Sequence, residues 1–163
     1  MIVVSDTTPL ISLMKVSLLD VLRTLFGEIL IPEAVFRELT TNDNFQEEAQ
    51  QIKNSRFIRV VVVDDPRVVN VLQKASGLDL GESEAIAYAD HVKADFLLMD
   101  EVKGRRVARA MGLPIMGTVG VLLAAYDDGV LSKGEVERAL EGMKKANRRI
   151  GNEIIESVKR RLV

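Results

Sequence analysis

Cysteine is absent from the 163-residue chain, and histidine occurs only once, as His91. The first absence excludes disulfide bonds and thiolate metal sites, and the second excludes the multi-histidine sites that usually bind zinc. If this chain binds a metal, oxygen atoms must therefore supply the ligands.

Long hydrophobic runs are also absent. No uninterrupted apolar stretch approaches the roughly 20 residues that a membrane-spanning helix requires. The first residues do not combine a basic segment with a long apolar one, as a signal peptide would. We therefore expect a cytoplasmic protein that does not insert into a membrane.

Neither sign of charge dominates, since the net charge is -2, and this argues against a protein that simply coats polyanions. Residues 1–100 contain 9 Lys and Arg against 16 Asp and Glu, a balance of -7, and residues 101–163 contain 13 against 8, a balance of +5. One interpretation is an acidic metal-binding pocket beside a basic nucleic-acid track. The alternative is a set of ordinary charged helix surfaces.

The length and the 47% content of hydrophobic residues suffice for one domain with a substantial core. Short apolar runs, mostly β-branched or aromatic, predict buried strands at residues 2–4, 29–31, 60–63, 96–99 and 114–116. Longer segments with helical spacing lie between these runs, a pattern typical of a parallel sheet covered on both faces. The predicted fold is a three-layer α/β/α sandwich with a five-stranded, mainly parallel sheet.

The C-terminal part of the chain is predicted to be helical. A mostly apolar helix is expected at residues 117–128, and the capping-box pair Ser132 and Glu135 predicts another at about 132–146. The last segment is amphipathic and is expected to pack on the core or on a second subunit. Its apolar face consists of Ile150, Ile154, Ile155, Val158 and Leu162.

Acidic residues follow two of the predicted strands. Asp6 comes directly after the first strand, and Asp100 and Glu101 come directly after the fourth. Open α/β sheets bind ligands at the carboxyl ends of their strands, so these carboxylates converge if the two strands are neighbours. The alternative is local, because Asp6 could cap the helix that follows it, and Asp100 and Glu101 could complement a helix dipole.

Two further carboxylates are candidates on helices. Glu82 lies close to the apolar stripe of its helix, whereas Glu84 is expected to point roughly the opposite way, toward solvent. Glu38 lies beside the apolar stripe that contains Val35 and Leu39, although by itself it is more simply explained as part of a solvated helix surface. Four carboxylates in one pocket would repel one another unless a divalent cation lay between them. Mg²⁺ or Mn²⁺ would suit such ligands and would support phosphodiester hydrolysis.

Five blocks of sequence resemble the PIN-domain family, and in particular the compact prokaryotic branch that is similar to VapC toxins. The likeness runs from about residue 2 to residue 131, and its specificity comes from the order and spacing of the blocks. The blocks are residues 4–11, 31–39, 81–86, 97–108 and 112–123.

The resemblance implies a metal-dependent endoribonuclease, the toxin of a toxin-antitoxin pair, which forms a homodimer and is inhibited by a small antitoxin. It implies a nuclease core at residues 1–131 and a C-terminal helical extension of the same domain at residues 132–163. Many relatives carry Asp where this chain has Glu82. The implied catalytic residues are Asp6, Glu38, Glu82 and Asp100, the Mg²⁺ or Mn²⁺ ligands are Asp6, Glu82, Asp100 and Glu101, and Thr8 and Thr118 would contact the RNA or its attacking water. Lys103, Arg105 and Arg106 lie just past Asp100 and could hold the RNA backbone, although an ordinary helix surface with fold-stabilising charge pairs would explain them equally well.

Two other functions would need features that the sequence lacks. A phosphatase with an aspartyl nucleophile would typically carry a second Asp at position 8, where this chain has Thr8. The segment from Gly117 to Gly120 lacks the full glycine fingerprint of a dinucleotide-binding domain. The remaining alternative is a non-catalytic PIN-like module that binds RNA or a protein.

Overall fold

The computed structural model describes residues 1–148 and 150–163. The strands are β1 (Val3–Ser5), β2 (Ile29–Pro32), β3 (Ile58–Val61), β4 (Phe96–Leu98) and β5 (Ile115–Met116). The helices are α1 (Thr7–Lys15), α2 (Asp20–Phe26), α3 (Glu33–Thr41), α4 (Gln46–Asn54), α5 (Pro66–Ser76), α6 (Leu80–Val92), α7 (Val102–Ala110), α8 (Thr118–Asp127), α9 (Lys133–Lys145) and α10 (Asn152–Arg161), with a 3₁₀ turn η1 (Asp43–Phe45).

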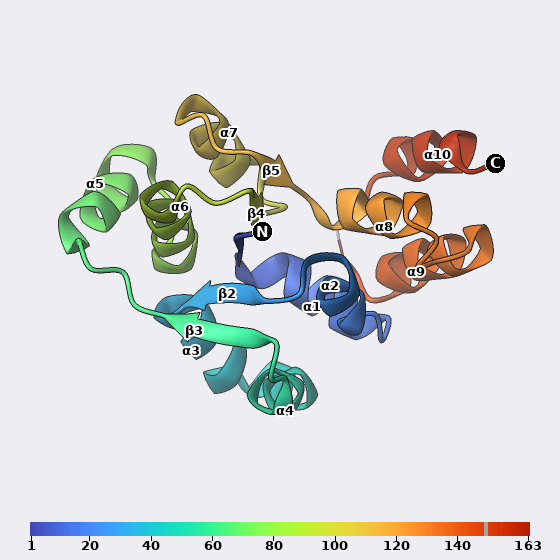
Figure 1. Ribbon diagram of the computed structural model, residues 1–163, viewed down its shortest axis with the longest axis horizontal. Helices are drawn as coiled ribbons and strands as arrows, with labels where there is room; N and C mark the ends of the chain where they lie inside the picture. Colours follow the sequence, from blue (N-terminus) through green and yellow to red (C-terminus); the bar gives the residue numbers. More distant parts are fainter. Residues whose placement is uncertain (149) are drawn as a thin grey trace.

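The strands form one sheet in the order β3-β2-β1-β4-β5, and every pairing is parallel. Val4 of β1 aligns with Leu30 of β2 on one side and with Leu97 of β4 on the other. Helices lie on both faces of this sheet (Figure 1). The predicted three-layer α/β/α sandwich is therefore confirmed, with a sheet that is entirely parallel.

The strand order reverses its direction between β1 and β4. The chain builds outward from β1 through β2 to β3 and then returns to place β4 on the other side of β1. The connections on the two sides therefore leave β1 and β4 in opposite directions. In open α/β sheets this arrangement opens a crevice at the carboxyl ends of the two strands, where ligands usually bind.

Each face of the sheet has its own hydrophobic core, because successive strand residues point to opposite faces. Val3 and Leu98 belong to the core formed with α1 to α4 and with α8, α9 and α10. Val4 and Leu97 belong to the other core, formed with α5, α6 and α7. The inner strands are thus buried on both sides, which explains why their sequences are continuously apolar.

The prediction of five buried strands is wrong for the strands at the two edges. β3 begins at Ile58 rather than at Val60, and Val60 and Val62 are 40% and 58% exposed. β5 is half-buried. An edge strand has no neighbour on its outer side, so an apolar run there does not imply burial.

The C-terminal helices follow the predicted pattern with one exception. Ser132 and Glu135 form the expected capping box at the start of α9, and Ile155, Val158 and Leu162 are buried. Val158 and Leu162 belong to the same core as α1 and α8, so α10 packs on the domain itself. Ile154, however, is 46% exposed. Among the described residues, no helix is both long enough and apolar enough to cross a membrane.

Candidate active site

Asp6 lies at the carboxyl end of β1, in the crevice between β1 and β4. Its backbone amide donates to the Leu98 carbonyl oxygen at 2.9 Å, which fixes the residue beside β4. The residue is 4% exposed, and its side chain accepts no capping hydrogen bond from α1 although it holds the N-cap position. The Asp6 side chain therefore does not form the N-cap hydrogen bond that the alternative interpretation predicted.

The environment of Asp6 strongly disfavours a negative charge. Burial, followed by repulsion from Glu82, Asp79 and Glu38, raises the pKa of Asp6 to about 8, and the Thr7 backbone amide offsets this shift in part. A carboxyl with such a pKa is mostly protonated at neutral pH unless a cation is nearby.

Glu38 is held beside Asp6 by the next residue of the chain. The Thr7 hydroxyl donates to Glu38 Oε2 at 2.6 Å, which ties α3 to the start of α1. Glu38 also approaches the start of α6, because a Cβ at Gly81 would lie 3.2 Å from Glu38 Oε2. The absence of a side chain at Gly81 therefore leaves room for the Glu38 carboxylate between α3 and α6.

Glu82 occupies the first turn of α6 and faces the same group of carboxylates. Its side chain accepts from the Asp79 amide at 3.0 Å, and its own amide donates to Asp79 Oδ1 at 2.8 Å, forming a capping box. Burial raises the pKa of Glu82, and Asp79, Glu101 and Glu38 add to the shift. Asp79 was not predicted as part of the site, although its position three residues before Glu82 is a capping-box signature.

The prediction that Glu84 points to solvent is wrong. Glu84 is 8% exposed and lies at the N-terminus of α3, where it faces the Ala34 amide at 3.4 Å. Helix α6 packs against α3 and α5 as well as against the sheet, so little of its surface meets water. Pro32 holds the N-cap position of α3 without a side-chain cap, and Glu84 supplies the negative charge that favours a helix N-terminus.

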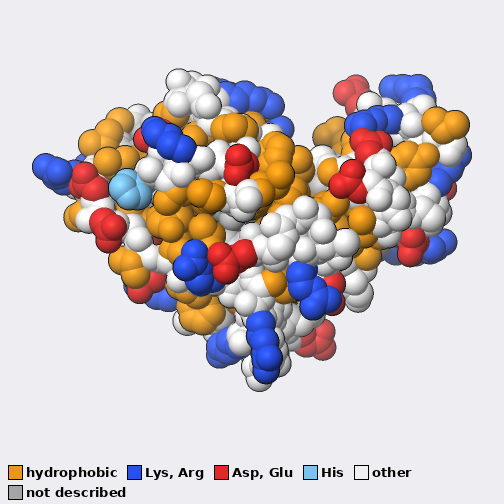
Figure 2. Space-filling view, viewed as in Figure 1, with side chains coloured by type: hydrophobic (Ala, Val, Ile, Leu, Met, Phe, Trp, Pro, Cys, Tyr) orange, Lys and Arg blue, Asp and Glu red, His pale blue; other side chains and the backbone are white. Residues whose placement is uncertain are grey.

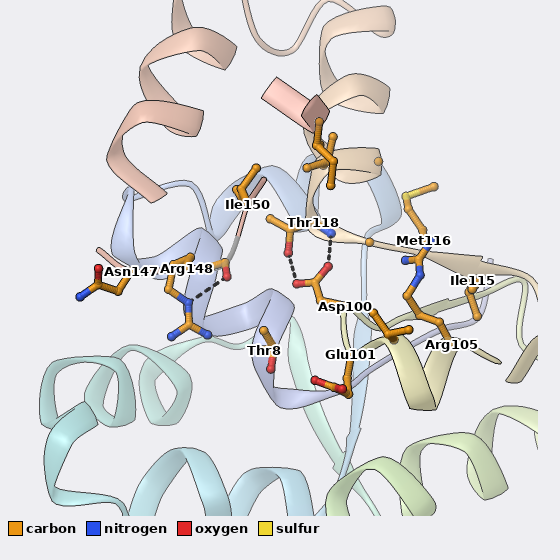
Figure 3. Close-up of a pocket in the computed structure, with 16 residues that line it drawn as sticks. Thr8, Asp100, Glu101, Arg105, Ile115, Met116, Thr118, Asn147, Arg148 and Ile150 are labelled. Carbon is orange, nitrogen blue, oxygen red and sulfur yellow. Dashed lines mark hydrogen bonds between the residues drawn. The ribbon is translucent and has the colours of Figure 1, made fainter. Parts of the chain in front are cut away.

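Asp100 lies just beyond β4 and has a different set of neighbours. Its carboxylate accepts from the Thr118 amide at 2.7 Å and from the Thr118 hydroxyl at 2.5 Å, as Figure 3 shows. Asp100 therefore caps α8. The approach depends on Gly117, where a Cβ would lie 2.9 Å from Asp100 Oδ1 and 2.8 Å from Arg105 Nη1.

The basic residues predicted to contact RNA do not lie together. Arg105 donates from Nη1 to the Met99 carbonyl oxygen at 2.9 Å and lines a cavity beside Asp100. Lys103 instead reaches the Gly77 carbonyl oxygen, at 3.4 Å from Nζ. Arg106 is exposed on α7 and does not line the cavity.

The cavity has a volume of about 860 Å³ and lies between α1, the loops after β4 and β5, and the C-terminal segment. Thr8, Asp100, Glu101 and Thr118 line it, so it contains four of the predicted site residues in addition to Arg105. Figure 2 shows the molecule hollowed between α7 and α10, with hydrophobic side chains along the hollow. Asp6, Glu38 and Glu82 lie outside its lining, on the α3 and α6 side of the crevice.

The sequence matches a known protein family. Residues 2–163 match the family described as the PIN domain. The chain belongs to the PIN-domain family. No curated protein gives a significant match to the sequence.

PIN domains are generally nucleases, and the family match extends through α9 and α10, beyond residue 131 where the resemblance of the sequence blocks ends. The division into a core at residues 1–131 and an extension at residues 132–163 stays a prediction. The carboxylates at the β1–β4 crevice therefore lie in a fold whose members are generally nucleases.

The carboxylates of this PIN domain supply the oxygen ligands that a hard divalent cation prefers, although their side chains do not converge on one point. Asp6, Glu38, Asp79, Glu82 and Glu101 are electrostatic neighbours, and all their donor atoms are oxygen. Within residues 1–148 and 150–163, no three acidic or histidine side chains are placed to bind a metal together. The unfavourable charge on Asp6 is the feature that a bound cation would relieve.

Proposed function

We propose that this PIN domain hydrolyses RNA phosphodiester bonds with Mg²⁺ or Mn²⁺ as cofactor. The observation that carries the proposal is Asp6, a buried carboxyl at the β1–β4 crevice whose pKa is raised to about 8 by burial and by the charges of Glu82, Asp79 and Glu38. Such clustering is unfavourable for folding alone, and functional sites are where such shifts concentrate.

In this proposal Asp6, Glu82 and Asp100, with Glu101, would hold the metal, and Glu38 would assist from α3. A divalent ion held there would supply an activated water and stabilise the charge that develops on the phosphate. The protein's part is to hold these carboxylates at the ends of adjacent strands and to keep Asp6 away from bulk water. Thr118 fixes the orientation of Asp100 through the two hydrogen bonds that it donates.

The RNA would approach from the side of the cavity. Thr8, Thr118 and Arg105 line that cavity and are the predicted contacts best placed to meet a phosphate beside Asp100. Lys103 and Arg106 would act at longer range, through the charge of α7. Lys103→Ala should therefore reduce cleavage less than Arg105→Ala does.

The narrower assignment is a toxin that forms a homodimer and is inhibited by a small antitoxin. Its support is the resemblance of five sequence blocks to the VapC-like branch of the family. Purification of the chain with and without the protein encoded beside its gene, followed by measurement of molar mass and of cleavage, tests both points. A monomer whose cleavage is unaffected by any neighbouring product would contradict the narrower assignment and leave the nuclease intact.

A non-catalytic PIN-like module that binds RNA or protein is the second candidate. It is favoured by one observation, the lack of three converging metal ligands in the described part of the chain. Chelation separates the two functions, because removal of the metal should abolish cleavage but would leave a pure binding activity unchanged.

The decisive assay incubates labelled structured RNA with the purified protein in Mn²⁺ or Mg²⁺, beside an EDTA control. Asp6→Asn and Asp100→Asn are the test variants, and Asp128→Asn, at the opposite end of α8 from Thr118, is the matched control. We expect metal-dependent cleavage that both test variants lose and the control retains. Cleavage that is indifferent to both test substitutions would come from a contaminating nuclease and would overturn the proposal.

A further inference from the structure

One wall of the cavity comes from the C-terminal segment rather than from the carboxylates of the crevice. Asn147, Arg148, Ile150 and Ile154 line this wall, opposite the loops after β4 and β5. Ile150 and Ile154 were predicted only to pack on the core or on a second subunit, and Asn147 and Arg148 had no predicted role. Their presence beside Asp100 means that the C-terminal segment contributes side chains next to the proposed reaction site.

Arg148 is the charged group of this wall. Its Nε donates to Ser12 Oγ at 3.2 Å, and Ser12 is buried, so the guanidinium is anchored to α1. Burial lowers the pKa of Arg148, and Asp100 and Glu48 oppose this shift without forming an ion pair with it among the described residues. Glu48 is paired with Lys15 at 2.5 Å instead. The terminal nitrogens of Arg148 are therefore left to bind an anion.

A second guanidinium lies on the other side of Asp100. Figure 3 places Arg148 and Arg105 on opposite sides of the Asp100–Thr118 pair. Arg105 is held by the Met99 carbonyl oxygen at 2.9 Å, so both cations are fixed by the protein before any ligand arrives. Two anchored cations on either side of a carboxylate suit a chain of phosphates, because Arg binds phosphate oxygens in a planar fork.

The remainder of the cavity is apolar. Met116, Val119, Ile150 and Ile154 supply hydrophobic surface, and Ile154 is 46% exposed on a helix whose other apolar residues are mostly buried. Exposed aliphatic surface beside fixed cations offers a face to a flat heterocycle and donors to its phosphate. A basic peptide would fit less well, because it would meet Arg105 and Arg148.

We propose that this cavity binds a nucleotide that adjoins the scissile phosphate of the RNA, with Arg148 binding its phosphate and the Ile150–Ile154 wall contacting its base. The inference rests on the proposed function, and it adds a substrate-binding role for the C-terminal segment. Arg148 would be a substrate-binding residue, and Ser12 a positioning residue that acts through it.

The test measures binding without cleavage. A fluorescent single-stranded RNA of about five nucleotides is titrated, in EDTA, onto the Asp6→Asn protein alone and combined with Arg148→Ala, Arg148→Lys or Arg160→Ala. Arg160 is the matched control because it is exposed on α10 and does not line the cavity. We expect Arg148→Ala to weaken binding about tenfold, as for the loss of a charge-assisted hydrogen bond. Arg148→Lys should recover part of this loss, and Arg160→Ala should change affinity less than twofold.

The salt dependence of RNA binding and a second variant distinguish a lost RNA contact from a merely structural effect. Arg148→Ala should also reduce the slope of log affinity against log salt by about 0.7, the value for one phosphate contact in single-stranded nucleic acid. Ile154→Glu adds negative charge to a position that is already exposed, so it should fold and should weaken binding as well. Thermal unfolding checks that each variant is folded.

The possible outcomes separate this inference from the proposed function. Unchanged RNA affinity in Arg148→Ala and Ile154→Glu, in a protein that cleaves RNA, would overturn the cavity assignment alone, and a peptide would then become the better occupant. An equal loss in Arg160→Ala would also overturn it, because the effect would then be general charge. Weakened binding in Arg148→Ala, in a protein that cleaves no RNA, would support the cavity and contradict the nuclease.

Discussion

Asp6 and Asp100 end adjacent parallel strands of the same sheet, yet their side chains meet different neighbours. Asp6 is buried and is repelled by Glu82, Asp79 and Glu38, so its pKa rises to about 8. Asp100 receives two hydrogen bonds from Thr118 and lies in a cavity that also contains Arg105 and Arg148. Similar position in the fold therefore does not imply similar chemistry, because neighbouring helices decide which groups meet each carboxylate.

The difference suggests a division of labour in the proposed nuclease. The α3 and α6 side of the crevice carries clustered negative charge, which a cation would neutralise. The α7 and C-terminal side presents guanidinium groups, which suit phosphate. Glu101 adjoins both regions, since its charge raises the pKa of Glu82 and its side chain lines the cavity.

The largest expected effect distinguishes Asp6 from Asp100 directly. Asp6→Asn should reduce metal-dependent cleavage at least about 100-fold, and it should raise the stability of the metal-free protein at pH 8. Asp100→Asn should also lose cleavage, but it should lower stability, because the Thr118 amide and hydroxyl lose a charged acceptor. Cleavage rates and thermal unfolding in EDTA measure both effects.

The sign of the stability effect follows from proton binding. The folded protein keeps a proton on Asp6 up to about pH 8, whereas the ordinary pKa of the group is 3.8. Between these values the folded state binds more protons than the unfolded state, so the free energy of unfolding falls as pH rises, with a ceiling of about 1.4 kcal/mol for each pKa unit. Asp6→Asn should remove this fall, and a variant whose metal-free stability still declined as steeply would contradict the environment described for Asp6.

Glu82 and Glu84 give the next contrast, within a single helix. Glu82→Gln should reduce cleavage about tenfold or more with little loss of stability, since Gln can still accept from the Asp79 amide in the capping box. Glu84→Gln should leave cleavage within about twofold and lower the free energy of unfolding by about 1 kcal/mol, because α3 loses the negative charge at its N-terminus. If the two variants exchanged these effects, the metal-facing carboxylate would be Glu84.

Thr118 tests how far Asp100 depends on its hydrogen bonds. Thr118→Val keeps the branched shape but removes the hydroxyl, and it should lower the free energy of unfolding by about 1–2 kcal/mol, as for a lost hydrogen bond to a charged group. Cleavage should fall several-fold because Asp100 loses part of its fixed orientation. Thr118→Ser retains the hydroxyl and serves as the control, so equal cleavage by both variants would exclude this role.

Gly117 gives the smallest expected effect. A Cβ at this position would lie 2.8 Å from Arg105 Nη1 and 2.9 Å from Asp100 Oδ1, so Gly117→Ala should displace both side chains. We expect cleavage to fall a few-fold with only a small change in thermal stability. Gly151→Ala is the control because a Cβ there meets no atom within 4 Å. Equal rates for the two variants would show that the position of Arg105 is unimportant.

Much of the fold could be predicted because it depends on local patterns. The inner strands are continuous apolar runs, and the capping box at Ser132 and Glu135 is visible in the sequence. The sequence predicted that Asp6 and Asp100 converge only if β1 and β4 are neighbours, and the strand order shows that they are. The edge strand β3 was placed about two residues late because the apolar run at residues 60–63 continues past the strand, while the strand itself includes Arg59, which an exposed edge tolerates.

The site could be predicted less completely because its contacts join distant segments. Asp6 was found from its place after a strand, but the burial of Glu84 depends on the packing of α3 and α5 around α6. The pairing of Asp100 with Thr118 spans 18 residues, and that of Arg148 with Ser12 spans 136. No periodicity in the sequence encodes such contacts, so Arg148 could not be distinguished in the sequence from the other basic residues of the C-terminal segment.

The most direct test of the central claim is a calorimetric titration of the metal-free protein with Mn²⁺ at pH 7, in buffers that differ in ionisation enthalpy. Such a series counts the protons released on binding. Because the pKa of Asp6 is about 8, a cation that binds beside it should displace close to one proton, and this release should disappear in Asp6→Asn along with most of the affinity. Absence of Mn²⁺ binding, or binding with the same proton release in Asp6→Asn, would contradict the assignment of this crevice as the metal site.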